Sequence, residues 1–293
     1  MKPTLLKECM AETIGTFLLV LFGCGSVIVS LMTGSQLGLL GVAAVWGFAV
    51  SLAIYVTQTM SGAHLNPAIT ISMVLYRRET FQAKKSVPYI CAQVTGAILA
   101  GATLYALFYN VILAFEQSHH LIRGADGSQL SAMIFGEYFP NPGLYGTDAA
   151  ASSQISVFGA CVGEAIGTAL LAFAVFSLTD KKNPVSEKNH VVPVVIGLTV
   201  SIIIIIIAPL TQAGLNPARD LGPRLFSYLA GWNSIAIPGP RGGFFTVYIA
   251  SPILGAITGG GIYSLLYNYS GFQNQQSLDH KELNVAPKLL KND

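Results

Sequence analysis

The chain has 293 residues, of which 52% are hydrophobic and only 10% are charged, and its formal net charge is +2. A soluble domain carries about a quarter charged residues, so this composition excludes an ordinary water-facing surface and indicates a membrane protein. The few charges fall outside the apolar runs and form no basic face, so nucleic acid is not an expected partner.

Apolar runs long enough to cross a lipid bilayer recur along the chain. A helical span needs about 20 mostly apolar residues to cross roughly 30 Å of hydrocarbon. The first run resembles a secretory signal, but Glu12 interrupts it and it is too long for a signal core, so a retained span is predicted. Six runs meet the length requirement, at residues 10–32, 39–58, 86–112, 156–179, 191–208 and 244–268.

The placement of lysine and arginine predicts the orientation of these spans. Basic residues gather at both ends of the chain and in the loops at 76–85 and 180–188, whereas the loops near 33–38 and 113–155 contain Arg123 alone. Because basic loops stay on the cytoplasmic side, both termini are expected there, as an even number of spans requires. The polar residues 271–293 are expected to form a cytoplasmic tail.

The two halves of the chain resemble each other. The segment "AETIGTFLL", which begins at Ala11, is echoed by "GEAIGTALL" from Gly163. The segment "GAHLNPA", which begins at Gly62, is echoed by "QAGLNPA" from Gln212. The two offsets agree within about two residues, so the chain is interpreted as a duplicated unit of three spans and one short extra segment.

This duplication predicts an inverted repeat within a single domain at 1–270, with halves at about 8–112 and 156–268. Because three spans is an odd number, the second copy enters the membrane upside down. An inverted repeat of this kind places its shared site near the bilayer midplane, at the interface of the halves.

Each half contains an Asn-Pro-Ala motif followed by an apolar run about half as long as a span. These motifs begin at Asn66 and Asn216. Asparagine is a good N-cap and proline is favoured in the first helical turn, so each motif is predicted to start a half-helix. A half-helix at membrane depth is tolerated where its irregular approach is buried in protein or lines a watery passage. The inversion is then expected to bring Asn66 beside Asn216.

Two convergent helix N-termini favour the passage of uncharged solutes. Each helix end carries about half a positive charge, so the pair repels cations and protons. The asparagine amides offer N–H donors, and the backbone carbonyls of the approach loops offer acceptors, so a solute with hydroxyl groups can exchange its water shell for these groups. The alternative is that the motifs are only capping signals. The first approach loop contributes Gly62, Ala63, His64 and Leu65.

These motifs are similar to those of the major intrinsic protein family, the aquaporins and aquaglyceroporins, and the resemblance covers essentially all of 1–270. Four segments resemble its glycerol facilitator branch in particular: "SGAHLNPAIT", "GLNPARD", "FEQSHHLIRG" and "LAGWNSIAIPG". The resemblance implies an all-α membrane protein of six transmembrane helices and two half-helices, assembled as a homotetramer in the cell membrane. It implies a passive channel for glycerol, related small neutral solutes and water.

The resemblance also implies a selectivity filter. The filter arginine of the family falls on Arg219, and its second-span aromatic residue falls on Trp46. A guanidinium offers donors to two hydroxyls, and an indole face packs against the carbon chain of a polyol. Two positions depart from glycerol facilitators, which typically have phenylalanine at Ala213 and glycine at Ile204. This filter looks more like that of nodulin-like plant intrinsic proteins, which leaves urea, water and neutral small acids open as solutes.

Other polar residues carry further predictions. Glu12 and Glu164 occupy equivalent places in the repeat and are expected to accept hydrogen bonds from the approach loops, with Gln93 in a similar role; a proton relay is the alternative. His64 either senses pH or lends its backbone carbonyl to the pore. No cofactor, metal or enzymatic constellation is expected from the motifs present. A proton-coupled secondary transporter is a rival function, because inverted repeats also build transporters.

Overall fold

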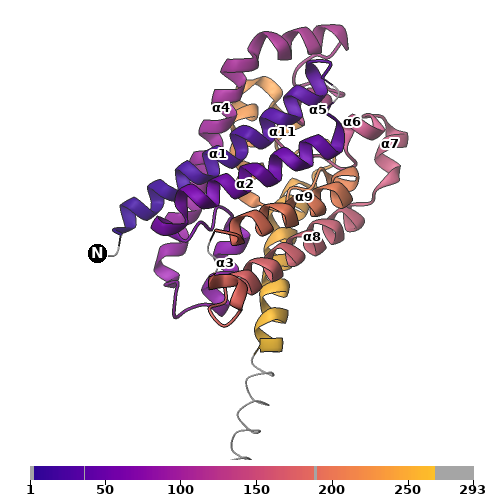
Figure 1. The fold of residues 1–293 in the computed structure, drawn as a ribbon. Helices are drawn as coiled ribbons and strands as arrows, with labels where there is room; N and C mark the ends of the chain where they lie inside the picture. The colour runs from indigo at the N-terminus through magenta and orange to yellow at the C-terminus, as the bar shows by residue number, and fades with distance from the viewer. Residues whose placement is uncertain (1–2, 36, 188–189, 268–293) are drawn as a thin grey trace, which may run out of the picture.

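The structure is a computed structural model that describes residues 3–35, 37–187 and 190–267. These residues form helices and loops without a strand (Figure 1). The prediction of an all-α fold with six spans is confirmed, while the predicted tail at 271–293 lies outside the described residues. The six membrane-length helices are Leu5–Met32 (α1), Gly38–Ser61 (α2), Ala83–Ser118 (a short η1, Ala83–Lys85, leading into α4, Ser86–Ser118), Val157–Leu178 (α8), Val192–Thr211 (α9) and Thr246–Tyr267, the last helix.

Four of the membrane-length helices, α1, α2, α4 and α9, extend beyond the predicted apolar runs. The α1 helix begins at Leu5, where the side chain of Thr4 caps its first turn. The Lys85 ammonium lies 2.7 Å from the Glu8 carboxylate and ties this polar first turn to the start of α4. Hydropathy detects the part of a helix that faces hydrocarbon, whereas capping and packing decide where the helix ends, so the apolar run underestimates its length.

Two shorter helices follow the Asn-Pro-Ala motifs, as predicted: α3 (Pro67–Tyr76) and α10 (Pro217–Ser227). The side chain of Asn66 accepts a hydrogen bond at 2.8 Å from the backbone N–H two residues further on. The side chain of Asn216 accepts the equivalent bond at 3.0 Å. Proline occupies the first turn of both helices, where its missing N–H leaves no intrahelical bond unmade.

The two halves join where α2 crosses α9, and the figure shows these helices side by side (Figure 1). A β-carbon at Gly47 would collide with the backbone of Gly197, and a β-carbon at Gly197 would collide with that of Gly47. The Ser51 hydroxyl donates across the crossing to a carbonyl of α9 at 3.0 Å, and the Ser201 hydroxyl donates to a carbonyl of α2 at 2.8 Å. The glycines therefore allow the two backbones to approach closely, and the serine hydroxyls bond each helix to the backbone of the other.

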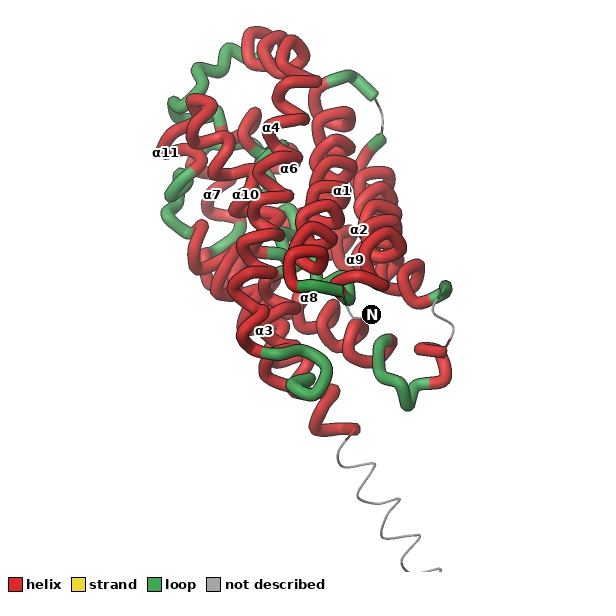
Figure 2. Tube along the Cα trace, turned by 90° about the vertical axis from the view of Figure 1, so that its left-hand side faces the viewer, coloured by secondary structure: helices red, strands yellow, loops and turns green. Residues whose placement is uncertain are grey.

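The other membrane-length helices pack next to this pair. The α1 helix packs against α2 and α4, while α8 packs against α9 and the beginning of the last helix. Both views place the short helices α6, α7 and α11 at the end of the molecule away from α3 (Figure 2). The short helices are α5 (Gln129–Ala132), α6 (Pro142–Tyr145), α7 (Ala149–Gln154), η2 (Pro184–Glu187), η3 (Tyr228–Trp232) and α11 (Asn233–Ala236).

Candidate functional site

The two motif asparagines bond reciprocally across the interface of the halves. The amide nitrogen of Asn66 donates to the carbonyl oxygen of Leu215 at 3.0 Å. The amide nitrogen of Asn216 donates to the carbonyl oxygen of Leu65 at 2.8 Å. The prediction that Asn66 lies beside Asn216 is thus confirmed, and the N-termini of α3 and α10 converge.

This exchange uses one of the two N–H groups on each asparagine amide. It also engages the carbonyls of Leu65 and Leu215, and each of these oxygens keeps a second lone pair that can accept a further hydrogen bond. Both asparagines line the central cavity, so each has a second amide N–H available to whatever occupies that cavity. The pair therefore acts as both a cross-link between the halves and a source of donors.

Glu12 holds the first approach loop. One carboxylate oxygen accepts from the Ser61 hydroxyl at 2.6 Å and from the backbone N–H of His64 at 3.0 Å. The other accepts from the backbone N–H of Leu65 at 2.7 Å and from the Gln93 side chain at 2.8 Å. The predicted role of this buried glutamate as an acceptor for loop backbone is confirmed.

Glu164 holds the second approach loop in the same way. One carboxylate oxygen accepts from the Thr211 hydroxyl at 2.5 Å and from the N–H of Gly214 at 2.8 Å. The other accepts from the N–H of Leu215 at 2.7 Å. A buried carboxylate that accepts several hydrogen bonds satisfies donors that an irregular loop would otherwise leave unpaired.

The approach loops have left-handed backbone at residues other than glycine. Ala63 and Leu65 both have φ of 53°, while Ala213 and Leu215 have φ of 61° and 55°. Such conformations cost on the order of 1–3 kcal/mol each and persist only where the surroundings determine them, most often at functional sites. The bonds to the two buried glutamates supply that constraint here.

A cavity of about 560 Å³ passes between the approach loops. It reaches from the asparagines to the mouth formed by residues such as Arg77, Thr80 and Lys182, which lie on the side predicted to be cytoplasmic. The structure therefore brings every predicted pore and filter residue to one cavity: Trp46, Gly62, Ala63, His64, Leu65, Asn66, Ile204, Ala213, Asn216 and Arg219.

Arg219 and Trp46 stack at the far end of this cavity. The guanidinium carbon of Arg219 lies 4.5 Å from the centre of a Trp46 ring, within the range of a cation–π contact. The guanidinium also donates to the carbonyl of Phe135 at 3.3 Å, which fixes it from a second direction. The arginine is only 4% exposed, so its remaining N–H donors face the cavity and are not hydrated by bulk solvent.

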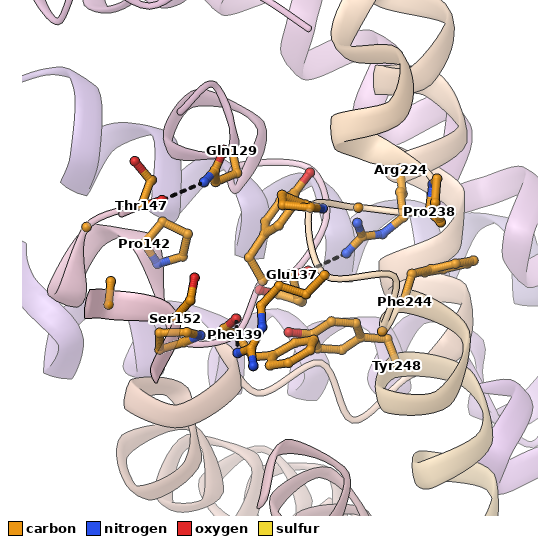
Figure 3. Close-up of a pocket in the computed structure, with 18 residues that line it drawn as sticks. Gln129, Glu137, Phe139, Pro142, Thr147, Ser152, Arg224, Pro238, Phe244 and Tyr248 are labelled. Carbon is orange, nitrogen blue, oxygen red and sulfur yellow. Dashed lines mark hydrogen bonds between the residues drawn. The ribbon is translucent and has the colours of Figure 1, made fainter. Parts of the chain in front are cut away.

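Glu137 is a site residue that the sequence interpretation missed. Its carboxylate forms an ion pair with Arg219, and its side chain is 1% exposed. Its backbone N–H donates to the Asp220 carboxylate at 2.7 Å, and its carbonyl accepts from Arg224, as the dashed line in Figure 3 shows. The only signal in the sequence is one acidic residue within the apolar run "SAMIFGEYFP".

The ring of His64 lies against aromatic side chains beside the cavity. Its centroid is 4.4 Å from that of Phe81 and 5.3 Å from that of Tyr89. Its Nδ1 atom lies 3.3 Å from the Thr70 hydroxyl. The ring is thus held by packing and one polar contact, and both of its expected roles stay predictions.

Six spans in an inverted repeat around two half-helices define a membrane channel. The chain belongs to the major intrinsic protein family, whose profile, described as Major intrinsic protein, matches residues 1–263. Membership makes it a channel protein and not an enzyme, as the sequence predicts.

Known relatives agree with this assignment. The chain is 40% identical over 264 residues to the Glycerol uptake facilitator protein of Escherichia coli (strain K12), covering 90% of this chain and 89% of the relative. It is 38% identical over 283 residues to the Propanediol uptake facilitator PduF of Citrobacter freundii, covering 96% of this chain and all (100%) of the relative. The structure of the aquaglyceroporin from Plasmodium falciparum matches with a TM-score of 0.74 and 26% identity, covering 89% of this chain and 96% of the other.

Proposed function

We propose that this chain is a passive channel for glycerol and related small uncharged solutes, and for water, that excludes ions and protons. The observation that carries the proposal is the reciprocal bonding of Asn66 and Asn216 inside one continuous cavity. The cavity therefore has amide N–H donors and apolar side chains along the same path. This combination suits molecules with hydroxyl groups on a short carbon chain. The names of the relatives, which refer to glycerol and propanediol, support this solute class.

The exclusion of ions follows from the same convergence of helix ends. Two N-termini directed at one point place about one positive charge there in total, which disfavours cations. Water molecules at this point accept hydrogen bonds from Asn66 and Asn216, so a proton wire would have to reverse its dipoles against fixed donors. The pore therefore conducts neutral molecules while a continuous proton relay is interrupted.

The solute range is a second question, on which the filter supplies an argument. Trp46 and Arg219 suit glycerol, whereas Ala213 is small and Ile204 is branched, so that one wall is wider and another is narrower than in a typical glycerol facilitator. A broader neutral-solute channel, which accepts propanediol, urea or small acids in their neutral form, is the alternative function. The relative named for propanediol favours this reading.

We also propose that the channel lies in the cell membrane as a homotetramer with both termini in the cytoplasm. The basic residues Arg77, Lys181 and Lys182 at the wide mouth support this orientation. Large exposed apolar side chains on several spans, including Phe48, Leu107 and Phe158, support contact with lipid or neighbouring subunits. Accessibility of engineered cysteines at either mouth in sealed vesicles tests the orientation, and the mass of the solubilised particle tests the assembly.

Stopped-flow light scattering of proteoliposomes tests the transport function. Vesicles that contain the protein are expected to swell faster than empty vesicles in glycerol, with a rate that rises linearly with concentration and is indifferent to a proton gradient. A comparison of glycerol, 1,2-propanediol, urea and a four-carbon polyol separates the two solute ranges. Saturable flux that follows the proton gradient would instead indicate the proton-coupled transporter.

A further inference from the structure

Glu137 contacts the filter arginine without lining the main cavity. It borders a smaller pocket of about 40 Å³ on the other side, among residues of the outer loops (Figure 3). Both carboxylate oxygens are buried, and neither accepts a hydrogen bond of good geometry from any described residue. Their partner is the Arg219 guanidinium, in an ion pair. The carboxylate is thus committed to this one cation.

The loop that carries Glu137 is fastened to the second half-helix and its approach. The backbone N–H of Tyr138 donates to the Gln212 side chain at 2.8 Å, and Gln212 in turn donates to the carbonyl of Met133 at 3.2 Å. Together with the bond from the Glu137 N–H to Asp220 at 2.7 Å, these contacts fix the carboxylate beside the arginine. The ion pair is therefore part of a rigid assembly and is not a chance surface contact.

The nearby charges compensate one another in pairs. The Arg224 guanidinium makes two bonds of 2.8 Å to the Asp220 carboxylate, and both side chains are fully buried. That pairing leaves Glu137 to compensate Arg219. Without Glu137, Arg219 would be one unbalanced positive charge in a buried site, where solvent screens charges poorly.

We propose that Glu137 is a positioning residue of the filter, whose carboxylate holds the Arg219 guanidinium against Trp46 and cancels its charge, so that the filter selects solutes by hydrogen bonding and size rather than by charge. The inference rests on the proposed channel function. The guanidinium has five N–H donors: one donates to the carbonyl of Phe135, the Nη2 nitrogen forms the ion pair with Glu137, and the remaining donors keep a fixed direction for solute hydroxyls.

The charge of this pair responds to pH. Burial raises the pKa of the Glu137 carboxyl above its ordinary value, although the charge of Arg219 lowers it. As the pH falls through this raised pKa, the carboxylate becomes neutral and the filter gains a net positive charge. Several titratable or charged groups interact electrostatically with Glu137. They are its neighbour Tyr138, Arg219, Asp220 and Arg224 of α10, Glu164 of α8, Cys24 of α1 and Tyr248 of the last helix.

Permeability to a small anion tests the proposal, because a merely structural residue does not alter charge selection. The experiment compares nitrate and glycerol permeability of proteoliposomes that contain the wild type, Glu137→Gln, Glu137→Asp and a matched control, Glu116→Gln. Glu116 is a buried acid paired with Arg123 at 2.7 Å, so the control removes the acid of an equivalent charge pair away from the filter.

At a pH above the raised pKa of Glu137, where the wild-type carboxylate is charged, Glu137→Gln is expected to raise nitrate permeability about tenfold or more, the scale of one uncompensated charge in a poorly screened site. Glu137→Asp and Glu116→Gln are expected to keep nitrate permeability near that of the wild type. Lowering the pH on the side of the loop that carries Glu137 is expected to raise nitrate permeability in the wild type but not in Glu137→Gln. The pH profile of the wild type alone tests the proposal if that variant folds poorly.

Nitrate permeability that is the same in Glu137→Gln as in the wild type would overturn the proposal, as would an equal rise in the Glu116→Gln control. The proposal would also be overturned if the nitrate permeability of the wild type did not change with pH over the whole range in which the protein stays folded. Glycerol flux of the wild type that does not exceed that of empty vesicles would overturn the proposed channel function instead, and so the two failures are distinguishable.

Discussion

The two halves of the molecule share a scaffold. Glu12 and Glu164 accept hydrogen bonds from equivalent loops. The Tyr89 hydroxyl donates to the carbonyl at the end of α2 at 3.0 Å, and the Tyr248 hydroxyl donates to the carbonyl at the end of α9 at 3.1 Å. Because these bonds satisfy the irregular backbone, both copies need them, and the repeat keeps them in both places.

The halves differ immediately after each Asn-Pro-Ala motif. The first half has Ile69 and Thr70 where the second has Arg219 and Asp220. Thr70 bonds to the neutral side chain of Gln93 at 3.0 Å, whereas Asp220 bonds to the backbone of Glu137 and to Arg224. The comparison teaches that the duplicated scaffold brings two helix ends together, while the buried charges of Arg219 and Asp220 that follow the motif belong to one half.

The largest expected effects come from removing the shared acceptors. Glu12→Ala and Glu164→Ala each leave several buried donors unpaired, at about 1–3 kcal/mol for each donor. Both variants should therefore unfold at much lower temperature in detergent than the wild type, as measured by loss of helical signal on heating. Glu187→Ala, at an exposed position, is the control and should not change the midpoint. Wild-type stability in either glutamate variant would show that the two scaffolds are not equivalent.

Closing the gap at the helix crossing should have the next largest effect. Gly47→Ala and Gly197→Ala each force a β-carbon into the opposite backbone, so each should lower stability by about 1–3 kcal/mol, with similar values for the two. Gly25→Ala is the matched control, because its β-carbon would meet only Leu104 at the ordinary distance of 3.4 Å. Thermal unfolding measures all three. A large difference between Gly47→Ala and Gly197→Ala would break the symmetry inferred for the crossing.

Arg219→Ala tests whether the two halves differ in function. Removing the guanidinium widens the filter and leaves the negative charge of Glu137 uncompensated, so proton leak and the flux of a four-carbon polyol relative to glycerol are expected to rise about tenfold. Ile69→Ala changes the matching position of the first half and is expected to leave both ratios near those of the wild type. Proteoliposome swelling and a pH-sensitive dye provide the measurements. An unchanged proton leak in Arg219→Ala would contradict the role assigned to the arginine.

The smallest expected effect concerns the filter wall. Ala213→Phe should add a bulky ring to the cavity that Ala213 and Trp46 both line, and should lower the flux of 1,2-propanediol and urea relative to glycerol by about two- to fivefold, within the range for one apolar group in a pocket. Ala63→Phe makes the same change at the matching position of the other half, away from the Arg219 and Trp46 pair, and should alter these ratios less. Identical ratios in Ala213→Phe and the wild type would show that Ala213 does not form a filter wall.

The sequence was sufficient to predict the architecture. A bilayer requires spans of a given length, and only helices satisfy their own backbone there, so the apolar runs predicted the six helices. The two motifs predicted both half-helices because Asn66 and Asn216 supply caps and the following prolines supply a first turn. An odd number of spans per copy then required inversion, and inversion brought the two asparagines together.

Only the tertiary structure decided how the filter arginine is held. Glu137 lies 82 positions before Arg219, in a segment without the periodicity or motif that would indicate its partner. Its place follows from the docking of the loop after α4 onto α10, through bonds to Asp220, Arg224 and Gln212. Local rules act over a few residues and the bilayer acts on whole spans, but a buried ion pair depends on where two distant segments meet, so it became visible only in three dimensions.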